Sequence, residues 1–211
     1  RIARAAARAL YEHSIDAEIA DLTQYCQRMY AAADLLVSTR PTAVSLPNAV
    51  NLVMKPLKNE SDLKTARHNL EERALAFVKR SEEAVSRIGT IGARHIRDGD
   101  VILTHCNSEA ALACILKAHK QGIDIEVYAT EVRPRNQGHI TAKTLSDAGV
   151  RTNFIVDSAA RYFMKEVDLC ITGADAITVN GSVINKIGTS QIALAAHEAR
   201  VSFLVAAETY K

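Results

Sequence analysis

Residues that interrupt regular structure are scarce in this chain. Its 211 residues include only 9 Gly and 4 Pro, whereas 48% are hydrophobic and 24% are charged. Collagen-like and disordered chains need far more Gly, Pro or polar residues, so both classes are excluded. The length suffices for one large domain or for two smaller ones. The composition therefore predicts a globular protein with a packed core.

An excess of charge of one sign is also absent. The chain carries 26 Lys and Arg against 24 Asp and Glu, a formal net charge of +2. Without a basic field, neither nucleic acid nor an anionic membrane is an expected partner, although a local site can still bind a small anion. No apolar run approaches the roughly 20 residues that span a bilayer, and no signal-peptide pattern opens the chain. We therefore expect a soluble, cytoplasmic protein.

The cysteines and histidines show no paired spacing. The four cysteines form no CxxC pair and no disulfide framework, as is typical of a chain kept reduced in the cytosol. The seven histidines include no HExxH motif. We therefore assign no metal site.

Ala, Leu and Ile recur at helical spacing through the first half of the chain. This periodicity predicts helices over Ile2–Tyr11, Ala17–Leu36 and Glu60–Ile88. Between them, Ser38–Asn48 contains two prolines and is expected to form a rigid loop. We assign residues 1–98 to an N-terminal helical domain.

From residue 99 onward, short β-branched runs alternate with helical segments. Such alternation predicts βαβ units in a parallel sheet covered on both faces, a Rossmann-like domain over residues 99–211. The expected strands are Val101–Thr104, Ile125–Thr130, Asn153–Val156, Leu169–Thr172 and Phe203–Ala207. The fold class is thus α/β, a helical domain followed by a parallel-sheet domain. Because the chain opens inside a helical pattern without Met and stops after an apolar run, we expect truncation at both ends.

Reactive side chains directly follow the expected strands. Ligands of open parallel sheets bind outside the carboxyl ends of the strands. The residues at these positions are His105, Cys106, Asn107, Ser108, Glu131, Arg133, Asp157, Asp175 and Glu208. Carboxylates at such turns also serve as ordinary helix caps. The pattern nevertheless favours a functional site at this edge of the sheet.

Cys106 is the strongest candidate among the thiols. It precedes a helix that Asn107 or Ser108 would cap, and the positive end of a helix favours the thiolate needed for a base or nucleophile. Free amides at the same helix start can hold a phosphate. His105 could orient the thiol, but neighbouring strand residues point to opposite faces, which argues against direct pairing. The other three cysteines are expected to be small buried hydrophobes.

Asp175 is the candidate general acid. Gly173 and Ala174 leave little bulk around its carboxylate, and a partly desolvated carboxylate can keep its proton near neutral pH. A turn or cap aspartate is the alternative. Further on, Asn185–Ser190 offers an amide, an ammonium and a Gly-Thr-Ser entry to a helix. This segment predicts a phosphate or sugar-hydroxyl cradle, although it is not a Walker A loop.

Two arginines, Arg40 and Arg133, are each followed by proline. The proline restricts the backbone of the residue before it. A guanidinium held in this way suits bidentate recognition of phosphate, and a solvated surface arginine is the alternative.

Six segments, in order along the chain, resemble the family that unites sugar-phosphate aldose–ketose isomerases with the regulatory subunits of translation initiation factor 2B. They are TRPTAVSLPNAV at 39–50, THCNS at 104–108, E-x-RP-x-x-QG at 131–138, GAD-x-I-x-x-NG at 173–181, INKIGTSQIALAA at 184–196 and AAETYK at 206–211. The resemblance covers nearly the whole chain. Within the family, SLPNAV, VDSAARYFM and AETYK are most similar to the archaeal branch that acts on ribose 1,5-bisphosphate.

The resemblance implies isomerisation of ribose 1,5-bisphosphate to ribulose 1,5-bisphosphate in AMP degradation, with Cys106 as proton acceptor, Asp175 as proton donor and no cofactor. It also implies a homo-oligomer of dimers, a hexamer, with AMP as a candidate activator. Substrate contacts are expected, from the resemblance and from the proline-flanked arginine, at Arg40, Ser108, Glu109, Ala110, Arg133, Asn185, Lys186 and Lys211. The alternatives are a methylthioribose-1-phosphate isomerase, which uses the same pair, and a non-catalytic regulatory subunit, against which the Cys and Asp argue.

The chain departs from the family pattern in two places. Members carry an Arg-Gly-Ala-Gly phosphate loop just before the RIARAA helix, and we attribute its absence here to a missing segment. Val132 stands where the family has Thr or Ser, which puts a hydroxyl contact there in doubt. A second phosphate calls for extra cations, which Arg40, Lys186 and Lys211 supply, whereas a methylthio group needs an apolar pocket. The charges therefore favour a sugar bisphosphate.

Overall fold

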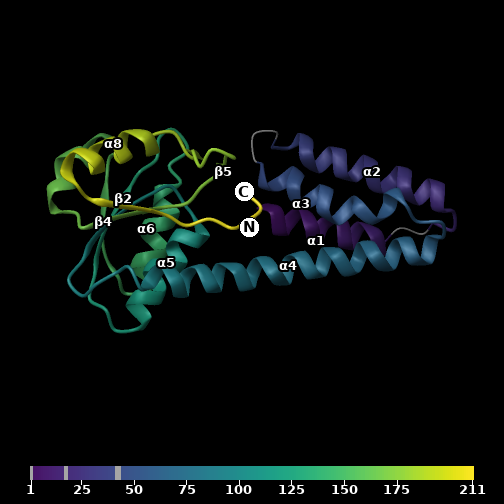
Figure 1. Cartoon of the computed structure of the whole chain (residues 1–211), viewed down its shortest axis with the longest axis horizontal. Coiled ribbons are helices and arrows are strands. Elements are labelled where there is room, and N and C mark those ends of the chain that lie inside the picture. The colour runs from purple at the N-terminus through teal and green to yellow at the C-terminus, as the bar shows by residue number, and fades with distance from the viewer. Residues whose placement is uncertain (1, 17–18, 41–43) are drawn as a thin grey trace. The chain divides into compact units, whose positions relative to one another are not determined.

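The computed structural model describes residues 2–16, 19–40 and 44–211, which group into two compact units (Figure 1). The helical unit is Arg1–Ala84 with Thr209–Lys211, and the α/β unit is Val85–Glu208. Helix α4 (Leu63–Ala93) runs through the division between them. The domain boundary at 98/99 stays a prediction.

The helices of the first unit bury one shared core. They are α1 (Ile2–Ile15), α2 (Leu22–Ser38), α3 (Ser45–Met54), the short 3₁₀ helix η1 (Lys55–Lys58) and the first part of α4. Asp21 caps α2 by accepting the Gln24 N–H at 2.8 Å. Inside the core, the Tyr25 hydroxyl lies 2.6 Å from Ser14 Oγ, which donates to Glu71 at 3.0 Å. The buried hydroxyls therefore have partners, as burial of a polar group requires.

The expected loop Ser38–Asn48 is wrong in its second half. Helix α3 begins at Ser45 and contains Pro47 in its first turn. Proline is tolerated there because the first N–H groups of a helix have no acceptor within it. Pro47 therefore lies in the first turn of a helix instead of prolonging a loop, and Pro41 lies outside the described residues.

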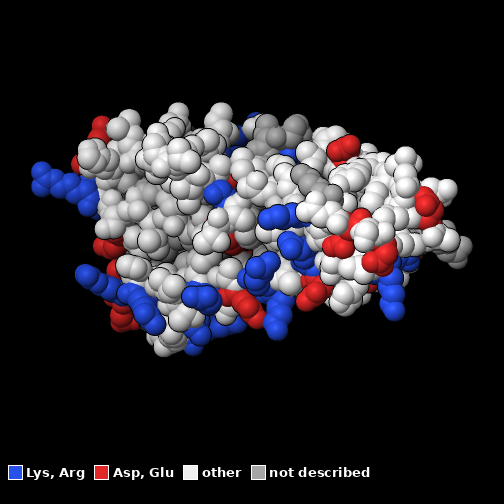
Figure 2. Space-filling view, turned by 45° about the vertical axis from the view of Figure 1, so that its right-hand side comes forward, with Lys and Arg blue, Asp and Glu red and all other residues white. Residues whose placement is uncertain are grey.

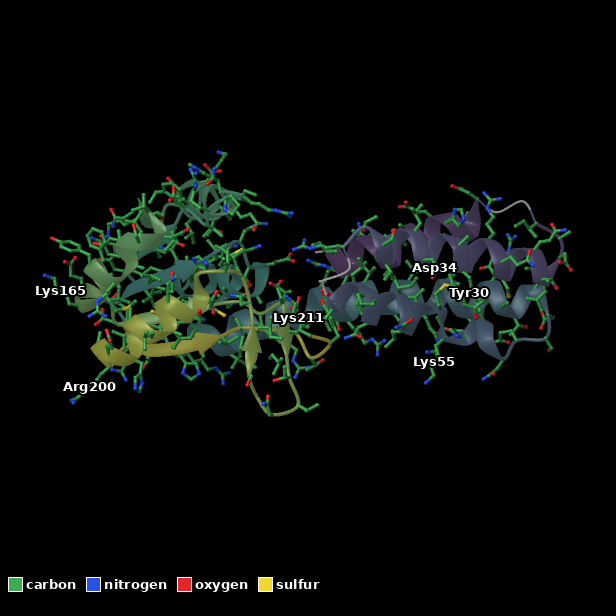
Figure 3. The ribbon with its side chains drawn as sticks, turned by 90° about the horizontal axis from the view of Figure 1, so that it is seen from above. Tyr30, Asp34, Lys55, Lys165, Arg200 and Lys211 are labelled. Atoms are coloured by element: carbon green, nitrogen blue, oxygen red, sulfur yellow. The ribbon has the colours of Figure 1, made fainter. Side chains whose placement is uncertain are left out.

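The last three residues group with the helical unit. The Tyr210 ring packs on Phe77 of α4 with 5.2 Å between ring centroids, and its hydroxyl lies 2.9 Å from Ser81 Oγ. The Tyr210 carbonyl accepts a hydrogen bond from Asn48 of α3 at 3.0 Å. These contacts hold Lys211, labelled in Figure 3, in the same unit as these helices.

Within the described part of the α/β unit, five parallel strands form one sheet. They are β1 (Val101–His105), β2 (Glu126–Thr130), β3 (Arg151–Ile155), β4 (Leu169–Thr172) and β7 (Ser202–Val205), in the order β3-β2-β1-β4-β7. Each neighbouring pair is parallel, with Thr104 opposite Ala129 and His105 opposite Thr172. The expected strands are confirmed, with ends that differ by two residues at most.

Helices cover both faces of this sheet. They are α5 (Glu109–Lys120), α6 (Gly138–Asp147), η2 (Asp157–Ala159), α7 (Ala160–Phe163), η3 (Met164–Glu166) and α8 (Thr189–Ala199). Because successive strand residues point to opposite faces, Ile102 packs with α5 and α6 whereas Leu103 packs with α7 and α8.

Burial raises the pKa of the Cys114 thiol to about 11 and that of Cys170 to about 12. Both thiols are buried hydrophobes, as predicted, whereas the same prediction is wrong for Cys26, which is only half-buried.

A two-stranded hairpin between β4 and α8 is absent from the sequence-based expectation. Its strands are β5 (Ala176–Ile177) and β6 (Val183–Ile184), which pair antiparallel. The turn contains Asn180 and Gly181, the latter at φ +83°. An Asn-Gly pair between apolar residues is a hairpin signal, and it was the one local sign of this element.

Charged side chains of both signs share the face of the molecule in Figure 2, where Lys and Arg lie among Asp and Glu. This mixture agrees with the formal net charge of +2. Of the helices in the described residues, none is long and apolar enough to cross a membrane.

Candidate active site

The strand order creates a switch point between β1 and β4. From β1 the chain proceeds through α5 to β2 and β3 on one side, and from β4 it proceeds through α8 to β7 on the other. In doubly wound sheets, ligands bind outside the carboxyl ends of the strands at such a point. Cys106 follows β1 and Asp175 follows β4. The topology therefore assigns the two candidate catalytic residues to the two strands that flank the switch point.

Ser108 and Gly173 hold the two turns in contact. A Cβ at residue 173 would lie 2.3 Å from Ser108 Oγ and 2.6 Å from Ser108 Cβ, so only glycine permits this approach. Ser108 is also the N-cap of α5, where its Oγ accepts the Ala111 N–H at 3.3 Å. Cys106 lies two residues before Ser108, and Asp175 lies two residues after Gly173. Cys106 and Asp175 thus each lie two residues from this close approach of the two turns.

Cys106 has a strained backbone. Its φ is +71°, a conformation that residues other than Gly, Asn and Asp rarely adopt. The half-buried thiol donates to Gln137 Oε1 at 3.5 Å, and the Cys106 carbonyl accepts from Thr141 Oγ1 at 2.8 Å. Retaining a side chain at such a position points to a functional requirement. Sequence reasoning could not detect this strain, because φ has no direct sequence signal outside glycine and asparagine.

Asp175 begins the β5–β6 hairpin. Its N–H donates to the Ile184 carbonyl at 2.8 Å, and its side chain is half-buried. The hydrogen bond to Ile184 therefore fixes the backbone from which the carboxylate extends. Its expected role as a proton donor stays a prediction.

The turn after β2 is organised by Asp157. The two carboxylate oxygens of Asp157 accept the N–H groups of Val132 at 2.8 Å and Arg133 at 2.9 Å. Val132 has φ +63° and a fully buried side chain, whereas Arg133 is exposed. A buried valine offers no polar contact to a ligand, in line with the doubt raised about a hydroxyl there.

The segment Asn185–Ser190 leads into α8. The Thr189 hydroxyl donates to the Lys186 carbonyl at 2.7 Å and accepts from Asn185 Nδ2 at 3.1 Å. Gly188, at φ +98°, is the N-cap of α8. The Thr189 N–H that follows it donates to the Lys186 carbonyl at 3.1 Å, so an anion at this helix start would meet the amides of Ser190 and Gln191. Lys186 is half-buried beside them. This arrangement, an ammonium next to a helix start, is suited to an anion.

His105 forms contacts that the sequence pattern did not suggest. Its ring is 1% exposed, with Nδ1 2.6 Å from Thr130 Oγ1 and Nε2 2.8 Å from the Ile187 carbonyl oxygen. Burial lowers the pKa of His105, and the Asp157 carboxylate, 3.9 Å from Nδ1, opposes that shift only in part. The ring ties β1 and β2 to the Asn185–Ser190 segment.

The other predicted contact residues are distributed over both units. Glu109 opens α5 and is half-buried, and Ala110, next to it, is buried. Arg40 and Lys211 belong to the helical unit and are half-buried. The structure thus gathers the candidates that follow β1, β4 and β6 in one unit, and the roles of Arg40 and Lys211 stay predictions.

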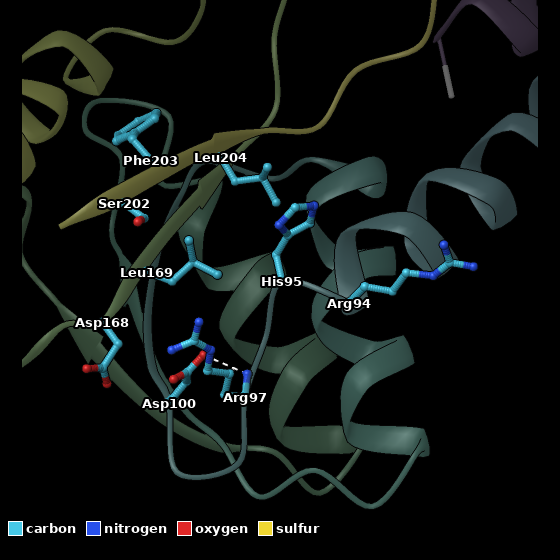
Figure 4. A pocket seen from close by; sticks show the side chains of 9 residues that line it. All are labelled: Arg94, His95, Arg97, Asp100, Asp168, Leu169, Ser202, Phe203 and Leu204. Carbon is cyan, nitrogen blue, oxygen red and sulfur yellow. Dashed lines mark hydrogen bonds between the residues drawn. The ribbon is translucent and has the colours of Figure 1, made fainter.

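A cavity of about 430 Å³ lies at the opposite, amino edge of the sheet (Figure 4). Both carboxylates that line it accept hydrogen bonds from backbone N–H groups: Asp100 from Arg97 at 2.7 Å and Asp168 from Val101 at 2.9 Å. The described residues that line it include none of the predicted site residues; they are Arg94, His95, Arg97, Asp100, Asp168, Leu169, Ser202, Phe203 and Leu204. The candidate active site is therefore assigned by topology and contacts, and not by this cavity.

The chain has a doubly wound sheet and a helical unit. It belongs to the Initiation factor 2 subunit family, whose sequence profile matches residues 1–211. This confirms the resemblance seen in the sequence. A crystal structure of the translation initiation factor eIF-2B from Pyrococcus horikoshii OT3 has the same fold, with a TM-score of 0.89 and 34% identity, covering 100% of this chain and 72% of that one.

Several curated relatives carry the names of enzymes. Ribose 1,5-bisphosphate isomerase of Methanocaldococcus jannaschii is 54% identical over 211 residues, which are 100% of this chain and 67% of that protein. Methylthioribose-1-phosphate isomerase of Thermosipho africanus is 37% identical over 202 residues, 90% of this chain and 58% of that protein. The chain thus spans about two thirds of the length of the first relative and less of the second.

Proposed function

We propose that this chain carries the catalytic region of an aldose–ketose isomerase that converts ribose 1,5-bisphosphate to ribulose 1,5-bisphosphate. The observation that carries the proposal is the contact of Ser108 with Gly173, which holds the turns of Cys106 and Asp175 at the switch point. The identity of 54% to a protein named ribose 1,5-bisphosphate isomerase supports this choice of reaction.

In the proposed reaction, the Cys106 thiolate takes the proton from C2 of the sugar. The electrons of that C–H bond form a double bond between C1 and C2, and the bond from C1 to the ring oxygen breaks. Asp175 gives its proton to the departing ring oxygen. The resulting enol then receives the proton from the thiol at C1 and returns its hydroxyl proton to Asp175, which leaves the ketone and restores both groups.

Two phosphates need two sets of donors. Lys186 and the amides at the start of α8 suit one phosphate, with Asn185 beside them. The start of α5, with Ser108, Glu109 and Ala110, supplies a second set of amides. Further donors are the guanidinium and ammonium groups of Arg40, Arg133 and Lys211. This number of cations favours a bisphosphate over a sugar with an apolar methylthio group.

The wider assignment follows the same resemblance. The protein acts in AMP degradation in the cytoplasm, as a homo-oligomer of dimers assembled into a hexamer, with AMP as a candidate activator and without a metal or organic cofactor. The similarity to the eIF-2B structure, at a TM-score of 0.89, favours one second candidate, a regulatory subunit that binds a nucleotide or sugar phosphate without turnover.

A direct assay separates these functions. Purified full-length protein is incubated with ribose 1,5-bisphosphate or with methylthioribose 1-phosphate, and the ketose product is followed by NMR. We expect turnover of the bisphosphate and not of the methylthio sugar. Turnover of the methylthio sugar alone identifies the other isomerase, and binding without any turnover identifies the regulatory subunit.

A further inference from the structure

His105 is a buried side chain at the end of β1 to which the proposed reaction gives no role. The Ile187 carbonyl oxygen, 2.8 Å from Nε2, can only accept a hydrogen bond, so Nε2 carries the hydrogen. Nδ1 of the neutral ring then accepts from the Thr130 hydroxyl at 2.6 Å. Both ring nitrogens are thus used, and the ring, 1% exposed, is closed to a ligand.

The same ring packs against the glycine that follows Ile187. A Cβ at residue 188 would lie 3.0 Å from both Cε1 and Nε2 of His105, closer than side chains normally approach. Gly188 also has φ +98°, which favours glycine. His105 therefore holds two consecutive residues, Ile187 by a hydrogen bond and Gly188 by contact.

These two residues join Lys186 to helix α8. The Thr189 hydroxyl closes the turn by donating to the Lys186 carbonyl at 2.7 Å. The Lys186 side chain is half-buried. An anion at this turn would meet the Lys186 ammonium and the free amides of α8 together.

We propose that His105 is a positioning residue whose Nε2–H bond to Ile187 and packing on Gly188 hold Lys186 and the start of α8 in the geometry that binds a phosphate group. The inference rests on the proposed function for the identity of the substrate, and on the contacts above for the position of the turn. Since Cys106 follows His105 directly, one strand end then supplies both the proposed base and the support of the phosphate turn.

Two substitutions separate the hydrogen bonds of the ring. In His105→Gln the side-chain amide reaches the position of Nε2 and can still donate to Ile187. In His105→Asn the amide reaches only the position of Nδ1 and keeps Thr130 as its partner. The probe is inorganic phosphate, titrated into full-length protein by calorimetry, together with hydrogen exchange at the amides of residues 187–190.

We expect His105→Asn to weaken phosphate binding by about 5- to 100-fold, the effect of losing one buried hydrogen bond, and to speed exchange at residues 187–190. His105→Gln should restore both measurements to within about threefold of the original protein. For ribose 1,5-bisphosphate, His105→Asn should raise KM by a similar factor with a smaller change in kcat. In a Lys186→Met background, His105→Asn should add little, because the two residues act through one turn.

Each of three results with the variants would overturn the proposal: phosphate binding and exchange unchanged in His105→Asn, equal losses in the Asn and Gln variants, or full additivity with Lys186→Met. Failure of the original protein to bind inorganic phosphate would also overturn it. Absence of turnover with ribose 1,5-bisphosphate counts against the proposed function instead, and the phosphate and exchange measurements then still decide the role of His105.

Discussion

The turns before and after strands β1 and β2 of the α/β unit differ in which residues have a positive φ. At the amino edge, the turns that lead into β1, β2 and β3 place Gly99, Gly122 and Gly149 at positive φ. At the carboxyl edge, the turns after β1 and β2 place Cys106 and Val132 there. A side chain in this conformation costs about 1–2 kcal/mol relative to a relaxed backbone. Glycine avoids this cost in the turns into β1, β2 and β3, whereas Arg200, before β7 at the same edge, retains it, as do Cys106 and Val132. For β1 and β2, the strained side chains therefore lie at the carboxyl edge, where the candidate site is assigned.

Removing the thiol at the strained turn should have the largest effect. Cys106→Ser should lower kcat/KM for ribose 1,5-bisphosphate by about 100- to 10,000-fold, because a hydroxyl near its normal pKa is a poor base. The free energy of unfolding, measured by urea denaturation, should change by less than about 0.5 kcal/mol. Cys26→Ser, at a half-buried thiol of the helical unit, is the matched control and should keep activity. Undiminished activity of Cys106→Ser would contradict the thiol-base mechanism.

Asp175→Asn tests the other side of the switch point. The amide keeps the size of the side chain but has no acidic proton, so kcat should fall by about 100- to 10,000-fold with little change in KM. Steady-state kinetics separate the two constants. A rise in KM alone would make Asp175 a binding residue, and the proton donor would then be sought among Asp157, Glu131 and Glu208.

Lys186→Met compares cations at the two edges. Loss of a phosphate contact in a shielded site should cost about 2–4 kcal/mol of transition-state binding, about 30- to 1,000-fold in kcat/KM. Arg97→Met, at the amino-edge cavity, is the control and should change kcat/KM less than about twofold. Lys211→Met, in the helical unit, should behave like Lys186→Met. Equal defects of the lysine variants with mono- and bisphosphates would mean that neither residue binds the second phosphate.

Gly173→Ala tests the contact between the turns. The added Cβ would lie 2.3 Å from Ser108 Oγ, so the turns must separate, with a loss of about 1–3 kcal/mol in the free energy of unfolding. Ser108→Gly removes the opposing atoms and places glycine, which is also favourable at an N-cap, at that position. The double variant should therefore recover part of the lost free energy of unfolding. Urea unfolding of the four proteins measures this. A stability loss at Gly173→Ala that Ser108→Gly does not reduce would show that the contact is not the cause.

The smallest expected effect is a pH dependence of stability from His105. Burial, with a smaller contribution from Lys186, lowers its pKa in the folded protein against the partial opposition of Asp157 and the Ile187 carbonyl. Below about pH 6.5, His105 therefore binds a proton in the unfolded chain while it stays neutral in the folded chain. The stability that the protein has above that pH is lost as the pH falls. Unfolding at about pH 8 and pH 5.5 should show a smaller loss for His105→Gln than for the original protein. An identical loss in both would assign the dependence to other groups.

Much of the fold follows from local patterns. The five strands and the parallel sheet were predictable because a buried parallel strand is a short apolar run between helical segments. The start of α3 was not, because Pro47 can open a helix as readily as it can interrupt one. The β5–β6 hairpin was missed because its strands have two residues each, too few for a periodicity to show.

The residues that follow the strands, and hence the candidates Cys106 and Asp175, could be read from the sequence, because the end of an apolar run is a local feature. Which turns lie in contact depends on the folded chain. Ser108 meets Gly173, and His105 meets Ile187, 82 residues further along the chain. Such pairs depend on the order of the strands in the sheet and on backbone angles such as φ +71° at Cys106. No short stretch of sequence encodes them, since the energy that holds each strained turn comes from its packing against distant parts of the chain.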